Sequence, residues 1–290
     1  MGTWRASAIL VTFFAFTVPL MPVQALLVRL SPKLARRFPH WYHKRVCRIL
    51  GVRLNIDGAV KRDTPVLLVS NHTSWLDIPV LSAVAPVSFV AKKEVGGWPF
   101  VSSLARLQRT VFVDRTRRQA TGEAATEIMS RLAGGDTVVL FAEGTSSDGN
   151  RVLPFKTSLF GAVKTGAEQD AGAVVVQTAA VVYTHLRGIP LGRAERPRVG
   201  WYGDMEMPPH AWQLLKGGPV DVAIKIGPPV KLSDFSGRKE LALKSEQNIR
   251  RDVMGLLRHR PGDPALIPVE PAQDARKSTL HRQEPTEKWT

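Results

Sequence analysis

Short apolar runs alternate along the chain with longer stretches whose apolar residues recur at helical spacing. The short runs are rich in β-branched residues, which is typical of strands, and the longer stretches favour helices. We predict strands at 65–70, 87–91, 110–114, 136–142, 173–184, 198–203 and 220–227. We predict helices at 77–84, 98–107, 119–133, 157–168, 209–216 and 238–258.

The order of these elements predicts an α/β fold. Several strand runs, such as "PVLLVS" at 65–70, are apolar almost throughout, as expected for strands covered on both faces. We therefore expect one domain at 54–260, with a central mixed, mostly parallel sheet flanked by helices. A chain of 290 residues that is 44% hydrophobic is long enough for such a core. The polar, proline-bearing end at 261–290 is predicted to be a disordered tail.

The N-terminal segment is strongly apolar, and residues 6–28 ("ASAILVTFFAFTVPLMPVQALLV") contain no charge. As a helix this stretch is long enough to cross a hydrocarbon core of about 30 Å. Pro19 and Pro22 interrupt it, so a kinked or re-entrant segment also fits. We predict a hydrophobic membrane anchor at 1–30. Two alternatives are a cleaved signal peptide, with "VQA" at 23–25 as the cleavage site, and a buried core helix.

Basic residues crowd the C-terminal side of the apolar segment. By the positive-inside rule they place the bulk of the protein on the cytoplasmic side of the cell inner membrane. Residues 31–53 include "HWYHKRVCRILG", which reads as a basic amphipathic helix with interfacial Trp41 and Tyr42. Such a helix is suited to an anionic membrane surface. The alternative is an ordinary surface helix whose apolar face packs on the domain.

Charge, cysteine and histidine content limit which ligands and binding partners the protein can have. Lys+Arg 40 against Asp+Glu 25 gives a formal charge of +15, which attracts nucleic acid, anionic lipid or an acidic carrier protein. No recognised nucleic-acid motif is present, and many of the cations lie beside the apolar segment, so we expect a membrane surface rather than nucleic acid. The single Cys47 excludes an internal disulfide. The histidines lack metal-ligand spacing, so we expect neither a metal nor a cofactor.

Polar clusters follow three of the predicted strands: "NHTSWLD" at 71–77, "DR" at 114–115 and "EGTSSDGNR" at 143–151. Ligand sites in open α/β sheets gather at the carboxyl ends of strands. Three such clusters therefore predict a site at this edge of the sheet.

His72 and Asp77 are the first candidates for chemistry. A neutral imidazole is well suited to accept a proton near pH 7, and a carboxylate on its other nitrogen fixes the tautomer. The alternative is a helix start, in which Asn71 or Ser74 caps the helix and Asp77 complements its dipole. Glu143 likewise has two interpretations: a second acid–base group or a capping carboxylate in a glycine turn.

At these residues the sequence resembles the 1-acylglycerol-3-phosphate acyltransferase (lysophospholipid acyltransferase) family. That family carries an Asn-His-x4-Asp block, a Phe-Val-Asp-Arg-like block and a Phe-Pro-Glu-Gly-Thr-Arg-Ser block, in this order. The corresponding stretches here are "NHTSWLD" at 71–77, "VFVDR" at 111–115 and "FAEGTSS" at 141–147. The resemblance covers roughly residues 55–230, and the shared order of three blocks makes chance agreement remote.

The resemblance implies transfer of a fatty acyl group from an acyl-CoA or acyl-carrier-protein thioester to the hydroxyl of a lysolipid, without an acyl-enzyme. It implies that His72 is the general base and that Asp77 orients it. It also implies that Arg115 binds an anionic headgroup. The acceptor pocket would then be lined by Glu143, Gly144 and Thr145.

Two positions depart from the family pattern: Ala142 replaces the proline of the third block, and Ser146 replaces its arginine. In the family that arginine is taken to hold the acceptor's phosphate, and a serine hydroxyl cannot supply its charge. "EGTSSDGNR" and "WYGDMEMPPHAW" look more like a bacterial branch that acylates lyso-ornithine lipid, whose carboxylate Arg115 can pair. We favour that acceptor. The alternative is 1-acylglycerol-3-phosphate, giving phosphatidic acid, or both acceptors.

Two other classes of function remain as alternatives. One is a serine hydrolase or thioesterase that uses Ser74 with His72, although no Gly-x-Ser-x-Gly elbow is present. The other is a membrane-tethered binding protein without catalysis.

Overall fold

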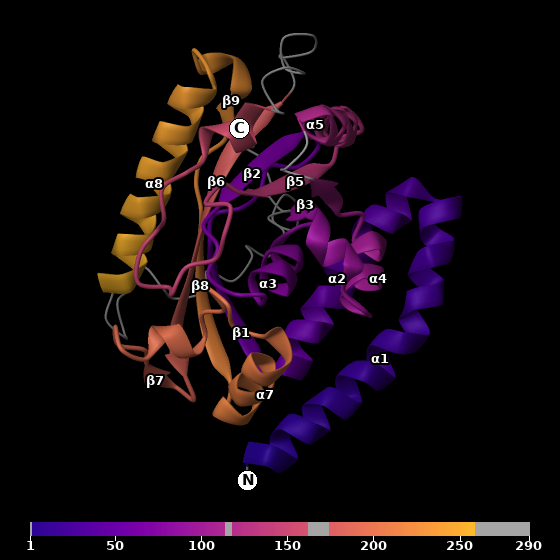
Figure 1. Cartoon of the computed structure of the whole chain (residues 1–290), viewed down its shortest axis with the longest axis vertical. Helices are drawn as coiled ribbons and strands as arrows, with labels where there is room; N and C mark the ends of the chain where they lie inside the picture. The colour runs from indigo at the N-terminus through magenta and orange to yellow at the C-terminus, as the bar shows by residue number, and fades with distance from the viewer. Residues whose placement is uncertain (1, 114–117, 162–173, 259–290) are drawn as a thin grey trace, which may run out of the picture.

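A single mixed sheet forms the centre of the molecule (Figure 1). The computed structural model describes residues 2–113, 118–161 and 174–258. The strand order is β1-β8-β6-β2-β5-β3-β4, and two short strands, β7 and β9, pair with β6. The strands are β1 Val52–Asp57, β2 Val66–Ser70, β3 Val87–Lys92, β4 Val111–Val113, β5 Thr137–Phe141, β6 Val175–Leu186, β7 Ile189–Pro190, β8 Val220–Ile226 and β9 Val230–Lys231.

Along this order the strands are parallel except where β6 meets β8. The predicted α/β class, with a mixed and mostly parallel sheet, is therefore confirmed. All five residues of β2 are buried, because helices cover both faces of the sheet at its centre. This explains why its sequence is apolar without alternation.

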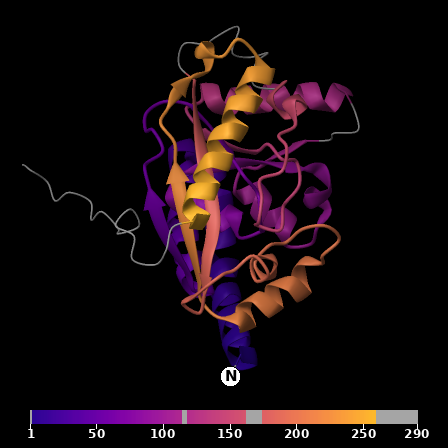
Figure 2. The ribbon, with the colours of Figure 1, turned by 90° about the vertical axis from the view of Figure 1, so that its left-hand side faces the viewer.

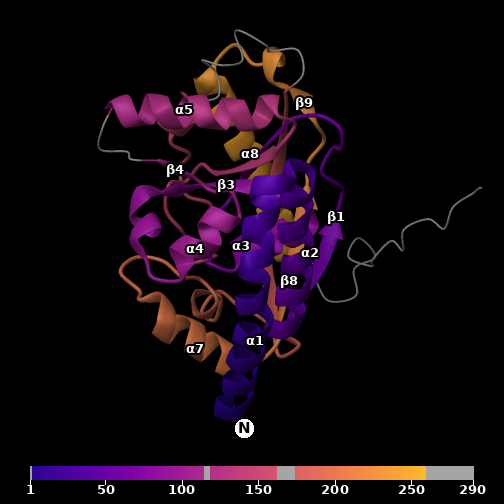
Figure 3. The same cartoon turned by 90° about the vertical axis from the view of Figure 1, so that its right-hand side faces the viewer.

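Helices cover the sheet on both sides. Helices α5 and α8 share one hydrophobic cluster with the sheet, and α2, α3 and α7 share the cluster on the other face. Figure 2 shows α8 crossing in front of the strands from one side, and Figure 3 shows α1 and α2 from the other. The helices of the domain are α3 Asp77–Val84, α4 Val101–Leu107, α5 Arg118–Ala133, α7 Met207–Gly217 and α8 Arg238–Arg258, with short 3₁₀ segments η1 Lys93–Gly97, η2 Thr157–Phe160, η3 Arg196–Arg198 and η4 Leu232–Asp234.

The apolar N-terminal segment forms α1 Gly2–Leu30, which is long and apolar enough to cross a membrane. Its only buried residues are Ala6, Thr17 and Gln24, so it is not the buried core helix that was one alternative. The two polar ones are anchored: the Thr17 and Tyr42 hydroxyls lie 2.7 Å apart, and the Gln24 amide donates to the carbonyls of Ala35 and Leu107. Helix α1 is thus tied to its neighbours while most of its apolar surface stays uncovered.

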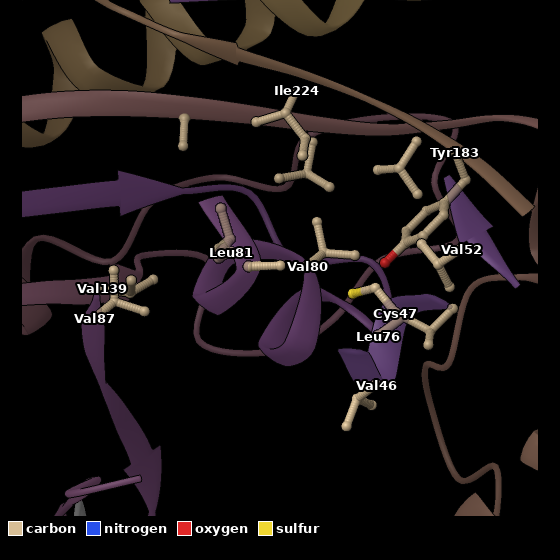
Figure 4. Close-up of a cluster of buried hydrophobic side chains, with 14 of the residues drawn as sticks. Val46, Cys47, Val52, Leu76, Val80, Leu81, Val87, Val139, Tyr183 and Ile224 are labelled. Atoms are coloured by element: carbon tan, nitrogen blue, oxygen red, sulfur yellow. The ribbon is translucent and has the colours of Figure 1, made fainter. Parts of the chain in front are cut away.

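The basic amphipathic segment forms α2 Pro32–Leu50 and ends at Gly51, whose φ of 77° suits a glycine helix stop. Its apolar side chains Val46, Cys47 and Leu50 are buried in the same cluster as α3 and the sheet. Figure 4 shows Val46 and Cys47 beside Leu76 and Val80. The apolar face of α2 therefore packs on the domain, as the surface-helix alternative proposed, and its basic face points outward.

The predicted strand at 198–203 is wrong. Segment η3 ends at Arg198, and the chain then follows an irregular path to α7. The backbone N–H of Trp201 donates to the carbonyl of Thr73 (2.8 Å) instead of joining a strand ladder, and Gly203 turns the chain with φ of 62°. Strand β1 Val52–Asp57 was not predicted, although its sequence VRLNID alternates apolar and polar residues as a half-buried strand does.

Two predicted helices also differ from the structure. The one at 98–107 begins only at Val101, after Pro99. In the one at 157–168, Thr157–Phe160 form a 3₁₀ turn, Gly161 is α-helical, and the remainder from 162 lies outside the described residues. The tail predicted at 261–290 lies outside them as well.

Candidate active site

His72 and Asp77 bracket the short connection from β2 to α3. His72 follows the carboxyl end of β2 by two residues, and Asp77 is the first residue of α3. Asn71 anchors the start of this loop, because its side chain exchanges two hydrogen bonds with the backbone of Val181 on β6 (2.9 and 2.8 Å). Neither Asn71 nor Ser74 caps the helix, since the N-cap position is Leu76 without a side-chain cap. The capping alternative for these two residues is therefore wrong.

The imidazole of His72 is held in one orientation. Its Nδ1 lies 2.8 Å from Oδ2 of Asp77. Because a carboxylate only accepts hydrogen bonds, Nδ1 carries the proton and Nε2 is left with a free lone pair. The ring stacks on Phe141 with centroids 4.1 Å apart. The His72 side chain is 19% exposed whereas that of Asp77 is 0% exposed, so the base faces the surface and its partner lies behind it.

Asp77 receives four hydrogen bonds. Oδ2 also accepts the backbone N–H groups of Thr73 (2.7 Å) and Ser74 (3.0 Å). Oδ1 accepts the hydroxyl of Tyr183 at 2.6 Å. A fully buried carboxylate needs such donors to remain charged, and a charged Asp77 is what stabilises an imidazolium beside it.

Tyr183 was not foreseen as a site residue. It lies near the end of β6, and burial beside Asp77 raises its pKa well above the usual range, so the hydroxyl stays protonated and remains a donor. The sequence signal was weak: a lone tyrosine closing the apolar run "VVVQTAAVVY" at 174–183. Nothing in that run shows which residue faces Asp77.

Glu143 follows the carboxyl end of β5 by two residues and is 1% exposed. Its Oε1 accepts the backbone N–H of His72 and its Oε2 that of Leu153, both at 2.8 Å. Burial raises its pKa to about 8, although the two hydrogen bonds oppose this shift. Glu143 therefore holds the backbone of His72 by a hydrogen bond, and its buried carboxyl group does not face a ligand directly. The following Gly144 turns the chain with φ of 73°, and Thr145 is exposed on that turn.

Ser146 joins two loops of the site. Its hydroxyl donates to the carbonyl of Trp201, whose own N–H binds the Thr73 carbonyl. Next to it, the N–H of Ser147 donates to the carbonyl of His72 at 2.9 Å. The Trp201 ring meets Trp98 edge to face, with centroids 5.9 Å apart. The mispredicted segment 198–203 is thus part of the site wall, which the sequence did not indicate.

Most of the predicted site residues come together at the carboxyl edge of the sheet. His72 and Asp77 form a pair, and Glu143 and Ser147 bind the His72 backbone. Arg115 lies outside the described residues. Among the residues that are described, no three His, Cys, Asp or Glu side chains gather in a way that could hold a metal ion.

Ser74 does not suit the serine hydrolase alternative. It is 0% exposed, and its backbone N–H binds the same Asp77 oxygen that holds His72. A nucleophilic hydroxyl must reach both the substrate and the free nitrogen of the base. Ser146 is engaged with the Trp201 carbonyl. The partly exposed His72 side chain is therefore the acid–base group that a substrate at this site can reach.

Comparisons with known proteins agree on one family. The Acyltransferase family matches residues 52–182, which include every predicted site residue. The chain is 47% identical to the lyso-ornithine lipid O-acyltransferase of Brucella abortus, over 86% of this chain and 94% of that one. It is 44% identical to the enzyme of the same name from Rhizobium meliloti, over 88% of each chain.

At about 31% identity the relatives carry two different names, lyso-ornithine lipid O-acyltransferase and 1-acyl-sn-glycerol-3-phosphate acyltransferase. The chain is 31% identical to the 1-acyl-sn-glycerol-3-phosphate acyltransferase of Neisseria gonorrhoeae, over 69% of this chain and 76% of that one. The solved structure of the 1-acyl-sn-glycerophosphate (LPA) acyltransferase PlsC from Thermotoga maritima has the same fold, with a TM-score of 0.65 at 24% identity, over 89% of this chain and 96% of that one.

Proposed function

This chain belongs to the acyltransferase family, and we propose that it transfers a fatty acyl group from a thioester to the hydroxyl of a lysolipid. The observation that carries the proposal is the His72–Asp77 pair, in which Nδ1 is bound to the carboxylate and Nε2 is free. A base in this arrangement contributes typically about 10²–10⁴ to the rate of a transfer that begins with loss of a hydroxyl proton.

The proposed reaction needs no covalent enzyme intermediate. Nε2 of His72 takes the proton of the acceptor hydroxyl while the oxygen attacks the thioester carbonyl carbon. The carbon–sulfur bond then breaks, and the thiolate leaves with the proton from the imidazolium. Asp77 stabilises the imidazolium in between, and Glu143 keeps the His72 backbone in place. Gly144 and Thr145 would line the acceptor side of the turn.

We propose lyso-ornithine lipid as the acceptor. Two relatives with that name share 44–47% identity over most of the chain, and others with it share 39% and 31%, against 31% for the phosphate-acceptor enzyme. Ser146 supports this choice, since its hydroxyl is engaged with the Trp201 carbonyl and supplies no charge for a phosphate. Arg115 is proposed to pair the headgroup carboxylate. The second candidate acceptor is 1-acylglycerol-3-phosphate, which the Neisseria relative favours.

We also propose how the enzyme meets its membrane. The uncovered apolar surface of α1 would anchor residues 1–30 at the inner membrane, with the domain facing the cytoplasm. On α2, the outward face carries exposed basic side chains for anionic headgroups, Lys33, Arg37, Lys44 and Arg48. The thioester would come from acyl-carrier protein or acyl-CoA, either of which suits the +15 charge.

The test uses purified full-length protein, an acyl-carrier-protein thioester and each acceptor separately. We expect acylation of lyso-ornithine lipid, lost in His72→Ala while the variant still sediments with membranes. Near-normal turnover by His72→Ala would overturn the base assignment. Use of lysophosphatidic acid alone would overturn the acceptor assignment and leave the acyl transfer standing.

A further inference from the structure

A basic cavity of about 840 Å³ lies away from His72, beside the edge strand β4. It is bounded by the last turns of α1, by η1, by the end of α4 and by α5. Figure 3 shows β4 between α5 and α4 on the side of the molecule that α1 covers. Four cations line the cavity, Lys93, Arg106, Arg109 and Arg131, with two carboxylates, Glu94 and Glu127.

Positive charge is in excess around this cavity. Arg131 pairs with Glu127 (3.1 Å). Arg109 shares one buried carboxylate, Asp136, with Arg36, each at 2.7 Å. Burial and the neighbouring Arg131 and Arg36 charges lower the pKa of Arg109, although Asp136 opposes the shift. A carboxylate shared between two guanidiniums neutralises only one of them, so the cavity attracts an anion.

Arg106 is the cation best placed to meet that anion. It is exposed and forms no ion pair with any residue that the structure describes. A guanidinium fork matches the oxygens of a phosphate and binds them with charge-assisted hydrogen bonds. Phe112 and Val28 add apolar surface to the same cavity, so the ligand it suits is an anionic group attached to a less polar chain.

The sheet register connects this cavity with the active site. Phe112 on β4 is paired with Ala91 on β3, and Phe141 on β5 is paired with Ser70 on β2. The pairing of β3 with β5 ends at Phe89 and Val139, each two residues before Ala91 and Phe141 and therefore on the same face as they are. Residues of one row in a parallel sheet point to the same face. Phe141 stacks on His72, so Phe112 and the base lie on one face, three strand spacings or about 14 Å apart across the sheet.

We propose that this cavity binds the phosphate of the phosphopantetheine arm that carries the acyl thioester. The inference rests on the proposed function, since the arm is common to acyl-CoA and acyl-carrier protein. The phosphate lies against Arg106 and its neighbouring cations. From there the arm runs along the face that carries Phe112 and Phe141 and delivers the thioester to Nε2 of His72. The arm is a linear chain with its phosphate at one end and its sulfur at the other. It can therefore bind in the cavity at one end and reach His72 with the other.

The experiment compares the wild type with Arg106→Glu on four donors at a saturating acceptor concentration: acyl-pantetheine, acyl-phosphopantetheine, acyl-CoA and acyl-carrier protein. Arg106 is exposed, so its substitution leaves the core intact. We expect KM to rise about tenfold for the three donors that carry the phosphate, and to stay unchanged for acyl-pantetheine, which lacks it. The matched control is Lys239→Glu on α8, another exposed cation, which should change none of the four values.

Each other outcome has a distinct meaning. An equal rise for all four donors, or no rise for any, overturns the phosphate site. A rise in KM for acyl-carrier protein alone would mean that Arg106 contacts the surface of the carrier protein, and it would also overturn the phosphate site. In a second series with the acceptor varied at saturating donor, a changed KM for the acceptor would assign the cavity to the other substrate and overturn the site. If the wild type transfers from no thioester, the proposed function fails, and calorimetry with free phosphopantetheine still tests the cavity: binding must weaken about tenfold in Arg106→Glu.

Discussion

The hydroxyl of Tyr183 donates a 2.6 Å hydrogen bond to Oδ1 of Asp77, while His72 binds the other oxygen, Oδ2, at 2.8 Å. Tyr183 and Asp77 are both buried. Figure 4 shows the Tyr183 ring reaching from β6 toward the cluster that holds Cys47 and Val80. The tyrosine and the histidine thus hold the carboxylate from two sides, so that it cannot rotate without losing one of them. Tyr183 is a positioning residue for the base.

We predict that Tyr183→Phe lowers kcat about tenfold, because a hydrogen bond to a charged group contributes roughly 1.5–3 kcal/mol. KM for donor and acceptor should not change, since Tyr183 is buried behind Asp77. Steady-state kinetics with each substrate varied in turn measures kcat and both KM values.

The matched control for this variant is Tyr42→Phe. Tyr42 is also buried and loses a hydrogen bond of similar length, to Thr17 (2.7 Å), but it lies on α2. This variant should lower stability without lowering kcat. If Tyr183→Phe behaves in the same way as Tyr42→Phe, the hydroxyl serves only the fold, and its positioning role is wrong.

The contrast between His72 and Tyr183 shows what the sequence could predict about the site. His72 and Asp77 are five residues apart, so a strand followed by a helix is enough to bring them together. Tyr183 is 106 residues from Asp77. Its place depends on β6 lying next to β2, and the sequence predicted both strands without their order. Contacts between residues close in the sequence could therefore be predicted from it, and contacts that depend on the order of the strands in the sheet could not.

The segment 198–203 shows a second limit of sequence reading. Its apolar and aromatic residues predicted a strand, but the backbone of Trp201 bonds to the loop that holds His72. The β-propensity of a residue depends on how well its side chain packs on a pleated surface. It does not indicate whether a neighbouring strand is available for pairing. In contrast, α3 Asp77–Val84 and α8 Arg238–Arg258 match the predicted ranges, because a helix makes its own hydrogen bonds and needs only one apolar face.

Ser146→Arg should shift the acceptor preference toward lysophosphatidic acid. The guanidinium would supply the charge that the serine hydroxyl lacks, and a charge-assisted contact to phosphate is worth roughly 1.5–3 kcal/mol, or about tenfold and more in relative kcat/KM. Competition between the two acceptors in one assay measures the ratio. Ser146→Ala is the control: it removes the bond to the Trp201 carbonyl without adding charge. An equal shift in both variants would mean that the loop contact, and not the charge, sets the preference.

Glu143→Gln should destabilise the protein by about 1–3 kcal/mol, because an amide offers one oxygen where two backbone N–H groups, of His72 and Leu153, require acceptors. The effect should also depend on pH. Burial raises the Glu143 pKa to about 8, above its usual 4.5. In the folded protein Glu143 therefore holds its proton more tightly than in the unfolded chain. The contribution of this neutral carboxyl group to the free energy of unfolding is fully present below pH 4.5 and is lost as pH rises through about 8.

Urea unfolding at pH 5 and pH 8 measures this dependence. The advantage of the wild type over Glu143→Gln should be larger at pH 5 than at pH 8. An exposed carboxylate at the start of α7 provides the control, and Glu206→Gln should change stability little at either pH. A wild-type advantage that grows toward pH 8 would show that the two hydrogen bonds, and not burial, determine the ionisation of Glu143.

Cys47 should be nearly inert in the folded protein. It is 2% exposed on the domain-facing side of α2, its thiol points at the carbonyl of Pro79 (3.5 Å), and burial raises its pKa to about 12. The thiolate is the reactive form, so maleimide labelling at pH 8 should be slower than for an ordinary thiol by on the order of a thousandfold. Because the chain has a single cysteine, labelling followed by mass spectrometry reports this site alone.

The same thiol tests how α2 sits when the protein is bound to anionic vesicles. If α2 keeps its apolar face on the domain, Cys47 stays protected on the vesicles and reacts only in urea. The control is Ser103→Cys in a Cys47→Ala background, an exposed position on α4 that should label at the full rate. Rapid labelling of Cys47 on vesicles, with Ser103→Cys unchanged, would mean that α2 leaves the domain to place its apolar face in the bilayer.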